Sequence, residues 1–266
     1  MIAMRAAFLV TLSLLASALP VKTMAQGFAA LVTPPRFELR AKAGETLRGV
    51  FELSNRSTAP TKFRVYTADW TLARDWSVDF KTELQPGSCR PWVAIERPEI
   101  VVPGGGRVRY RFDVAVPADA SPGECRFAIM VEGADPSMAK GAGLDIPIAG
   151  RLGIIVYVNV GDTLPRIALL GGKVVDHNGR RVPAIVVRND GAAHGRLFGF
   201  LNGRDAKGTS YELSPSDLPI LPGETREVIL TPSTEGNDAP VLAYPVTVTG
   251  RLEWQGGKVD LDQRFE

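Results

Sequence analysis

The sequence predicts an all-β protein, with two immunoglobulin-like β-sandwich domains in tandem after a cleaved signal peptide. Short runs of alternating apolar and polar residues recur along the chain, and turn-forming residues separate them. The 27 glycines and 20 prolines are scattered rather than clustered, as many tight turns require. The N-terminus alone departs from this pattern.

Residues 1–25 have the layout of a secretory signal. Arg5 gives a positive start, residues 6–19 form an apolar run without a charge, and Thr23 and Ala25 place small residues before Gln26. A membrane anchor is the alternative, but the run is shorter than the roughly 20 residues that span a bilayer. We therefore expect a chain that is exported to a bacterial periplasm and is not embedded in a membrane.

Past the signal, the alternating segments follow turns at close spacing. They include residues 37–39, 47–53, 62–66, 108–114 and 126–131. Apart from weak candidates in short loops, no run of helical period lies between them. Strands at this spacing, with no helices between them, favour sandwiches.

A domain boundary is predicted near residues 161–165, which gives an N-terminal domain at 26–163 and a C-terminal domain at 164–266. A weak internal repeat supports two related modules. The strand and polar turn at residues 51–55 are echoed at 185–191, and the proline–glycine turn and strand at 103–114 are echoed at 222–230.

The two cysteines, Cys89 and Cys125, allow one internal disulfide in an oxidising compartment. The chain-entropy model gives such a bridge a stabilisation of roughly 3–4 kcal/mol. Two buried free thiols are the alternative, and export makes them the weaker one.

The longest alternation runs from Leu144 to Val160. Leu144, Ile146, Ile148, Leu152 and Ile154 continue one aliphatic row, which Gly150 interrupts. The run far exceeds an average strand of about five or six residues. A last core strand of the first sandwich explains residues 152–160, but aliphatic side chains on an edge strand are normally avoided. The segment 144–148 therefore suggests a strand onto which another chain docks.

Three features resemble the PapD-like periplasmic chaperones of the chaperone–usher pilus pathway. The first is the N-terminal run at residues 31–39 with its Arg36. The second is the element Gly123–Val131, in which a glutamate and a small residue precede an aromatic-containing strand. The third is the long strand at 144–160, similar to that family's donor strand. The resemblance implies two immunoglobulin-like domains and a partner that is a pilin or other surface subunit. It also allows an outer-membrane usher as a second partner.

The resemblance also implies a basic pair that grips the partner's terminal carboxylate. Arg36 stands where the family has its arginine, but Gly153 stands where the family has a lysine. Arg151, on the same face of the strand, is the nearest replacement, because a guanidinium can bind a carboxylate bidentately. Both arginines are equally compatible with ordinary solvated strand positions.

Other functions find little support. The formal net charge of +2, with mixed signs along the chain, does not suggest a nucleic-acid binder. The two histidines, His177 and His194, have no nearby cysteine with which to form a metal site, and no nucleophile elbow or phosphate loop is present. We expect no catalysis and no cofactor. A periplasmic chaperone that donates a strand is the main hypothesis, and a structural or adhesive cell-surface module is the alternative.

Overall fold

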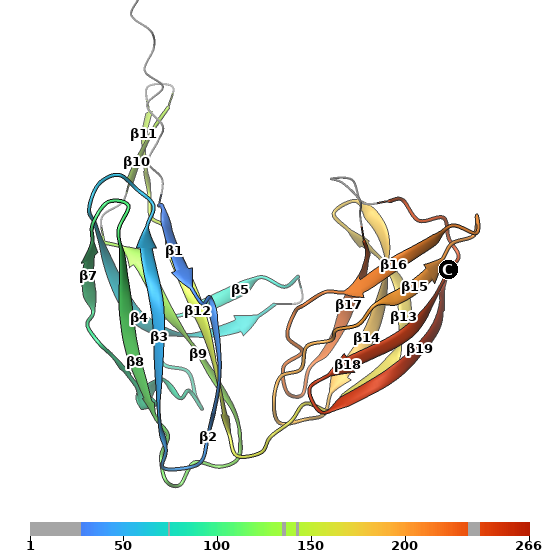
Figure 1. Cartoon of the computed structure of the whole chain (residues 1–266), viewed down its shortest axis with the longest axis horizontal. Coiled ribbons are helices and arrows are strands. Elements are labelled where there is room, and N and C mark those ends of the chain that lie inside the picture. The colour runs from blue at the N-terminus through green and yellow to red at the C-terminus, as the bar shows by residue number, and fades with distance from the viewer. Residues whose placement is uncertain (1–27, 74, 135–136, 142–143, 234–239) are drawn as a thin grey trace, which may run out of the picture.

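The structure is a computed structural model, and it describes residues 28–73, 75–134, 137–141, 144–233 and 240–266. It shows the predicted all-β protein with two immunoglobulin-like sandwiches (Figure 1). The first contains β1 (Ala30–Thr33), β2 (Arg36–Ala41), β3 (Thr46–Asn55), β4 (Thr61–Leu72), β5 (Val78–Lys81), the short 3-10 helix η1 (Arg90–Trp92), β6 (Val93–Ile95), β7 (Glu99–Val102), β8 (Arg107–Ala115), β9 (Gly123–Gly133) and β12 (Arg151–Val160).

The second sandwich contains β13 (Ile167–His177), β14 (Arg180–Asn189), β15 (Leu201–Arg204), β16 (Ser210–Pro215), β17 (Thr225–Pro232), β18 (Val246–Trp254) and β19 (Gly257–Phe265). These strands form one seven-stranded sheet in the order β13-β14-β17-β16-β15-β18-β19. Its first and last strands come into contact, so the sheet wraps around a core of its own (Figure 1).

Two sheets enclose the core of the first sandwich. One has four strands in the order β1-β3-β8-β6, and the other has six, with β2-β12-β9-β4-β5 in a row and β7 paired to β4. The chain changes sheet at Pro34, because β1 pairs antiparallel with β3 whereas β2 pairs parallel with β12. The alternation in β8 predicts the burial that is observed, since Tyr110, Phe112 and Val114 are buried and Arg109 and Arg111 are exposed.

The weak internal repeat has a structural counterpart in two buried asparagines. Asn55 ends β3 and donates from Nδ2 to the carbonyls of Ala59 at 2.8 Å and Val102 at 3.1 Å. Asn189 ends β14 and donates in the same way to Ala193 and Ile220, both at 2.8 Å. Each amide therefore holds a turn against the strand end that precedes the proline–glycine turn, which explains why both modules keep this sequence rhythm.

The aliphatic run from Leu144 to Val160 is not one strand, contrary to the sequence-based expectation. It is divided into β11 (Leu144–Ile148) and β12, and β11 pairs only with β10 (Ser137–Gly141) in a separate two-stranded sheet. The division falls at Gly150, where an added Cβ would lie 2.0 Å from the side chain of Phe28. Phe28 packs on the first core beside Phe63, so the chain next to β12 must leave room for its ring.

Candidate partner-binding site

The outer face of the six-stranded sheet is apolar and turns toward the second sandwich. Both faces of β9 are buried at its centre, because Phe127, Ile129 and Val131 fill the first core while Ala128 and Met130 face outward. We call the outward cluster the interdomain face. It comprises Tyr66, Ala68, Trp70, Leu72, Phe80, Ala128, Met130, Ile155 and Tyr157, with Leu221 from the second sandwich.

Charged groups meet where the linker joins the two sandwiches. Glu124 at the start of β9 accepts hydrogen bonds from His194, at 2.8 Å from its backbone N–H and at 2.6 Å from Nδ1. The imidazole stacks on Tyr157 at 3.8 Å between centroids, and its Nε2 lies 3.7 Å from the carboxylate of Glu38. A charged contact therefore joins β2 and β9 to the second sandwich.

The surroundings set the charge of this contact. Burial lowers the pKa of His194, but hydrogen bonds and charges from Glu124 and Glu38 outweigh it and raise the pKa above 6.5. The same histidine lowers the pKa of Glu38 below 4.5. Burial raises the pKa of Tyr157 to about 12, although Arg196 opposes the shift. The two carboxylates thus favour the cationic form of the histidine between them.

Arg36 lies at the start of β2, opposite Ile155 of β12. Its side chain is 39% exposed and pairs with Glu38 at 3.0 Å. Because parallel partners project to the same side, Arg36 shares the outward face of the sheet with Ile155 and Tyr157. Arg196 lies two residues after His194 in the second sandwich, and its charge works to lower the pKa of both Tyr157 and Glu38. The structure therefore brings Arg36 and Arg196 to one end of the interdomain face.

Arg151 lies elsewhere on that face, four positions along β12 from the partner of Arg36. At about 3.3 Å per residue the two backbones are roughly 13 Å apart. Its guanidinium lies 5.9 Å from the ring centre of Phe80. Its hydrogen bond and charge also oppose the rise in the pKa of Tyr66 that burial causes. The two predicted clamp arginines share a face, but the structure does not bring them together.

Packing explains why a glycine stands at position 153, and the sequence alone did not reveal this. A Cβ at this position would lie 2.4 Å from the ring of Phe80 and 3.3 Å from the sulfur of Met130. The ring of a residue on β5 therefore covers the position at which the resemblance implies a lysine. A long side chain at residue 153 requires the ring of Phe80 to move.

The predicted donor residues divide between two environments. Ile154 is fully buried in the core of its own sandwich, and Leu152 is partly buried against that core. The side chains of Leu144, Ile146 and Ile148 lie outside the described residues, although their backbone forms β11.

The two edges of β12 are not equally covered. All of Arg151–Val160 pairs with β9, whereas pairing with β2 extends only over Ile155–Val160. Among the described strand pairs, Arg151–Ile154 thus has a neighbour on one side only. The free half of β12 leads directly toward β11.

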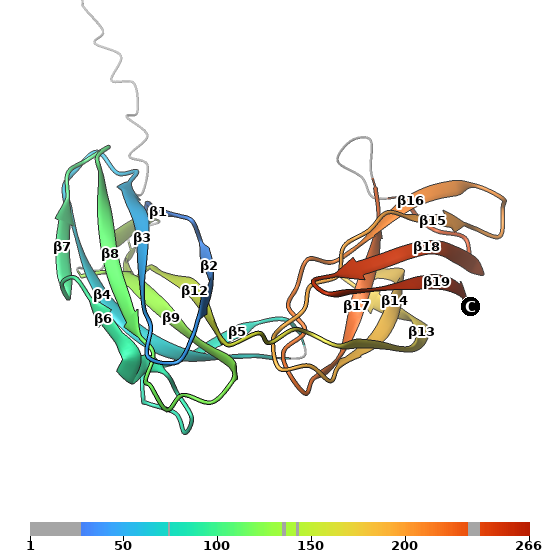
Figure 2. The ribbon, with the colours of Figure 1, turned by 60° about the horizontal axis from the view of Figure 1, so that its bottom comes forward.

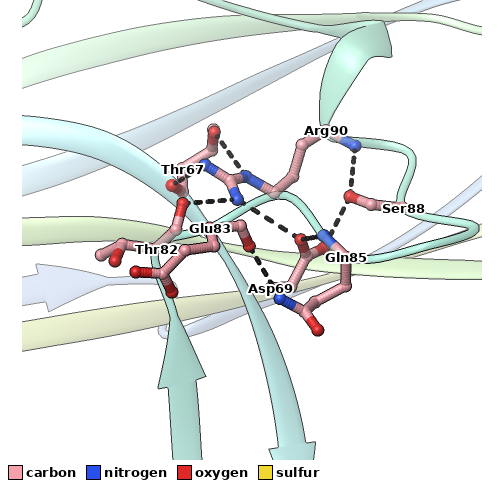
Figure 3. A network of polar contacts seen from close by, with 7 residues as sticks. All are labelled: Thr67, Asp69, Thr82, Glu83, Gln85, Ser88 and Arg90. Carbon is pink, nitrogen blue, oxygen red and sulfur yellow. Dashed lines mark hydrogen bonds and ion pairs between the residues drawn. The ribbon is translucent and has the colours of Figure 1, made fainter.

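The disulfide joins Cys89 and Cys125, as predicted, with Cα atoms 6.1 Å apart. Beside it, buried Asp69 on β4 accepts from Ser88 at 2.6 Å and from the backbone of Gln85 at 3.0 Å (Figure 3). Arg90 donates to Asp69 and also to the carbonyls of Thr67 and Thr82. This network ties the segment after β5 to β4.

Sequence reasoning missed most of the interdomain contact. Glu38, Tyr157 and Arg196 belong to no motif that predicts this contact, and the sequence indicates no interdomain role for His194. The described residues contain no group of His, Cys, Asp and Glu that could hold a metal ion. Nor does that part of the chain include a helix long and apolar enough to cross a membrane.

Comparisons with known proteins give matches in structure only. No family model matches the sequence. No curated protein is similar to it in sequence. Similar solved structures include the CupB2 chaperone of Pseudomonas aeruginosa, at 12% identity over 89% of this chain and 100% of the other, with a TM-score of 0.46.

Two further matches have comparable extent. The Escherichia coli chaperone DraB is 16% identical over 91% of this chain and 99% of its own, with a TM-score of 0.46. A chain of the CsuC–CsuE chaperone–tip subunit complex of Acinetobacter baumannii Csu pili is 10% identical over 89% and 98%, with a TM-score of 0.44. All three matches are at low sequence identity and extend over both sandwiches.

Proposed function

We propose that the protein is a periplasmic chaperone that binds pilus, fimbrial or related surface subunits by donating a β-strand, without catalysis or a cofactor. The observation that carries the proposal is the uneven pairing of β12, whose Arg151–Ile154 half has a described neighbour only on the β9 side. A strand edge with unused backbone donors and acceptors accepts an extended segment of another chain. The proposal includes export by residues 1–25 and domains at 26–163 and 164–266.

The aliphatic row supplies the side chains for that pairing. Leu144, Ile146, Ile148 and Leu152 are the proposed donor residues, and the row ends at Ile154, which is also part of the chain's own core. Backbone pairing provides affinity, while alternate side chains that enter a partner's groove provide specificity. The separation of β11 from both sandwiches supports this role, because its pairing with β10 contributes to neither sheet of the first domain.

Arg36 and Arg151 are the proposed contacts for charged groups of the partner. Arg36 is the better placed for a terminal carboxylate, because it is part-exposed at the end of the interdomain face and its ion pair with Glu38 is at the surface. Arg151 lies beside the free half of β12 and would contact the partner further along the strand. A guanidinium at either place can bind a carboxylate with two parallel hydrogen bonds.

The decisive experiment replaces Leu144, Ile146 and Ile148 together by serine. We expect the thermal midpoint to stay within about 2 °C of the wild type, because β11 lies outside both sandwich sheets. Recovery of a complex should be lost when the variant is co-expressed with pilus or other surface subunits in a bacterial periplasm, because the proposed pairing buries the apolar area of the donor row in the complex.

The matched control is Ile154→Ala, which removes an aliphatic side chain from the same row at a fully buried position. It should lower the free energy of unfolding by roughly 2–5 kcal/mol. A serine variant that is equally destabilised but still binds subunits would make 144–148 plain core, and would favour the structural or adhesive surface module instead.

A further inference from the structure

The hairpin of β4 and β5 leaves the first sandwich and reaches the second. Figures 1 and 2 both show β5 extending from the first domain toward the second, and Figure 1 shows it apart from the linker. The two strands pair at Asp69–Leu72 and Val78–Lys81, beyond the part of β4 that pairs with β9. Residues of this hairpin therefore meet partners that the rest of the first sheet does not reach.

Arg226 of β17 captures the hairpin tip. Its guanidinium donates to the carbonyl of Ala73 at 2.8 Å and to that of Leu72 at 2.7 Å. Two further hydrogen bonds, at 2.7 and 3.0 Å, join it to both carboxylate oxygens of Glu224. Arg226 is only 8% exposed, and a buried guanidinium is stable because its donors and its charge are matched in this way.

Trp76 of the hairpin makes a further contact with the guanidinium of Arg226. Its indole lies 4.8 Å from the Arg226 guanidinium, at the distance of a cation–π contact. To reach this position, Trp76 adopts a φ of 68°, a left-handed conformation that is unusual for a bulky residue. The hydrogen bond from its backbone N–H to the carbonyl of Ala73 and the contact with Arg226 of the second sandwich both surround this position.

The hairpin is held at both ends. At the tip, Asp75 accepts from the backbone and the hydroxyl of Ser77, at 3.1 and 2.7 Å. At the base, the Arg90 network ties Thr82, just after β5, to β4 (Figure 3). The hairpin can therefore transmit a fixed position from one sandwich to the other.

Among the described residues, the two sandwiches touch beside the linker, through Glu124 and His194, and again at the hairpin, through Arg226. Leu221 of the second sandwich also packs on the interdomain face. A single contact next to a linker leaves two domains free to rotate about it, whereas a second contact away from the linker removes that rotation. We propose that the β4–β5 hairpin is an interdomain brace that fixes the angle between the sandwiches.

The brace has a consequence for binding that rests on the proposed function. In the order β2-β12-β9-β4-β5, the hairpin occupies the side of the sheet opposite to β2 and β12. The brace thus closes the interdomain face on the β5 side, where Phe80 also covers Gly153, and leaves the strand edge at Arg151–Ile154 for a partner. A cleft of fixed width binds more tightly than a hinged one, because less conformational freedom is lost on association.

The test measures the angle in the free protein. Spin labels on Thr46→Cys and Lys207→Cys, both at exposed positions in different sandwiches, report the interdomain distance by double electron–electron resonance. Arg226→Gln and Trp76→Gly each remove one half of the capture, and glycine retains the left-handed backbone at residue 76. We expect the distance distribution to become at least about twofold broader in both variants.

The matched control is Arg251→Gln, which removes an arginine whose ion pair with Asp260 stays within the second sandwich. Its distribution should keep the wild-type width. If Arg226→Gln fails to fold, Trp76→Gly decides, because Trp76 is only half-buried. An unchanged width in the folded Trp76→Gly variant overturns the brace. Since no subunit is present, a failure of the chaperone proposal leaves this result unaffected.

Discussion

The pKa of His194 is raised by residues that are distant in sequence. Glu124 and Glu38 both belong to the first sandwich, and together they raise the pKa of a histidine that burial alone would lower. Arg36 and Arg196 lie near the same carboxylate, Glu38, and Tyr157 stacks on the imidazole. One side chain therefore couples protonation to the contact between the domains.

This coupling predicts a pH-dependent stability. A raised pKa in the folded state gives stability that is complete below about 6.5 and is lost as the pH rises through the folded pKa. The lowered pKa of Glu38 acts in the opposite direction, with stability complete above about 4.5 and lost on acidification. The contact should therefore be strongest between these two values.

Urea unfolding at a series of pH values tests this prediction. His194→Gln should flatten the loss of stability above pH 6.5, whereas His177→Gln, at an exposed position, should leave the wild-type slope in place. A His194→Gln protein that loses stability with the same slope as the wild type would contradict the assignment of the charged form.

The two candidate clamp arginines also make a prediction at this scale. Arg36→Ala should lower subunit affinity by at least about tenfold while costing less than about 1 kcal/mol of stability, because its ion pair is exposed to solvent. Arg151→Ala should have a smaller effect on affinity, since it lies far from Arg36 on the face. Arg109→Ala, on the exposed side of β8, serves as the control. Wild-type affinity in the Arg36→Ala, Arg151→Ala double variant would exclude a carboxylate clamp at these residues.

At the scale of elements, the disulfide connects β9 to the segment that supports the hairpin. Cys89 is buried just before η1, and Asp69 and Arg90 hold the same segment against β4. The bridge closes a sequence separation of 36 residues. It therefore restricts the unfolded chain while it holds the base of the β4–β5 hairpin near the start of β9.

Removal of the disulfide should lower the stability by a similar amount whichever cysteine is replaced. Cys89→Ser and Cys125→Ser should each lower the free energy of unfolding by about 4 kcal/mol, because either change removes the same cross-link. Chemical denaturation measures the loss, and alkylation followed by mass spectrometry checks the wild type. Two cysteines that are alkylated in the native, periplasm-purified protein would show that the bridge does not form there.

Elements were predictable from the sequence where local pattern decides them. The alternation in β8 follows from period-two burial, and the turns follow from glycine and proline. The break between β11 and β12 was missed, because its cause is Phe28, whose packing against Gly150 depends on the tertiary fold. Alternation continues across the break, so it could not show where pairing changes.

For the whole molecule, the sequence predicted two sandwiches but not how they meet. The internal repeat pointed to related modules, and buried Asn55 and Asn189 supply its physical basis. The contacts of Glu124 with His194 and of Leu72 with Arg226 join residues that are far apart in the chain. No local periodicity encodes such pairs, so half of the candidate site was accessible only through the structure.

The parallel pairing of β2 with β12 has a consequence for the order in which the chain can fold. Arg36 is synthesised near the start, yet its neighbour Ile155 follows almost the whole first sandwich. Contacts between such distant positions form slowly, because a long loop must close before they contribute. Until β12 is present, β2 and β9 therefore lack the strand that they share, and a chain interrupted before Ile155 leaves both of them open to aggregation and to proteases.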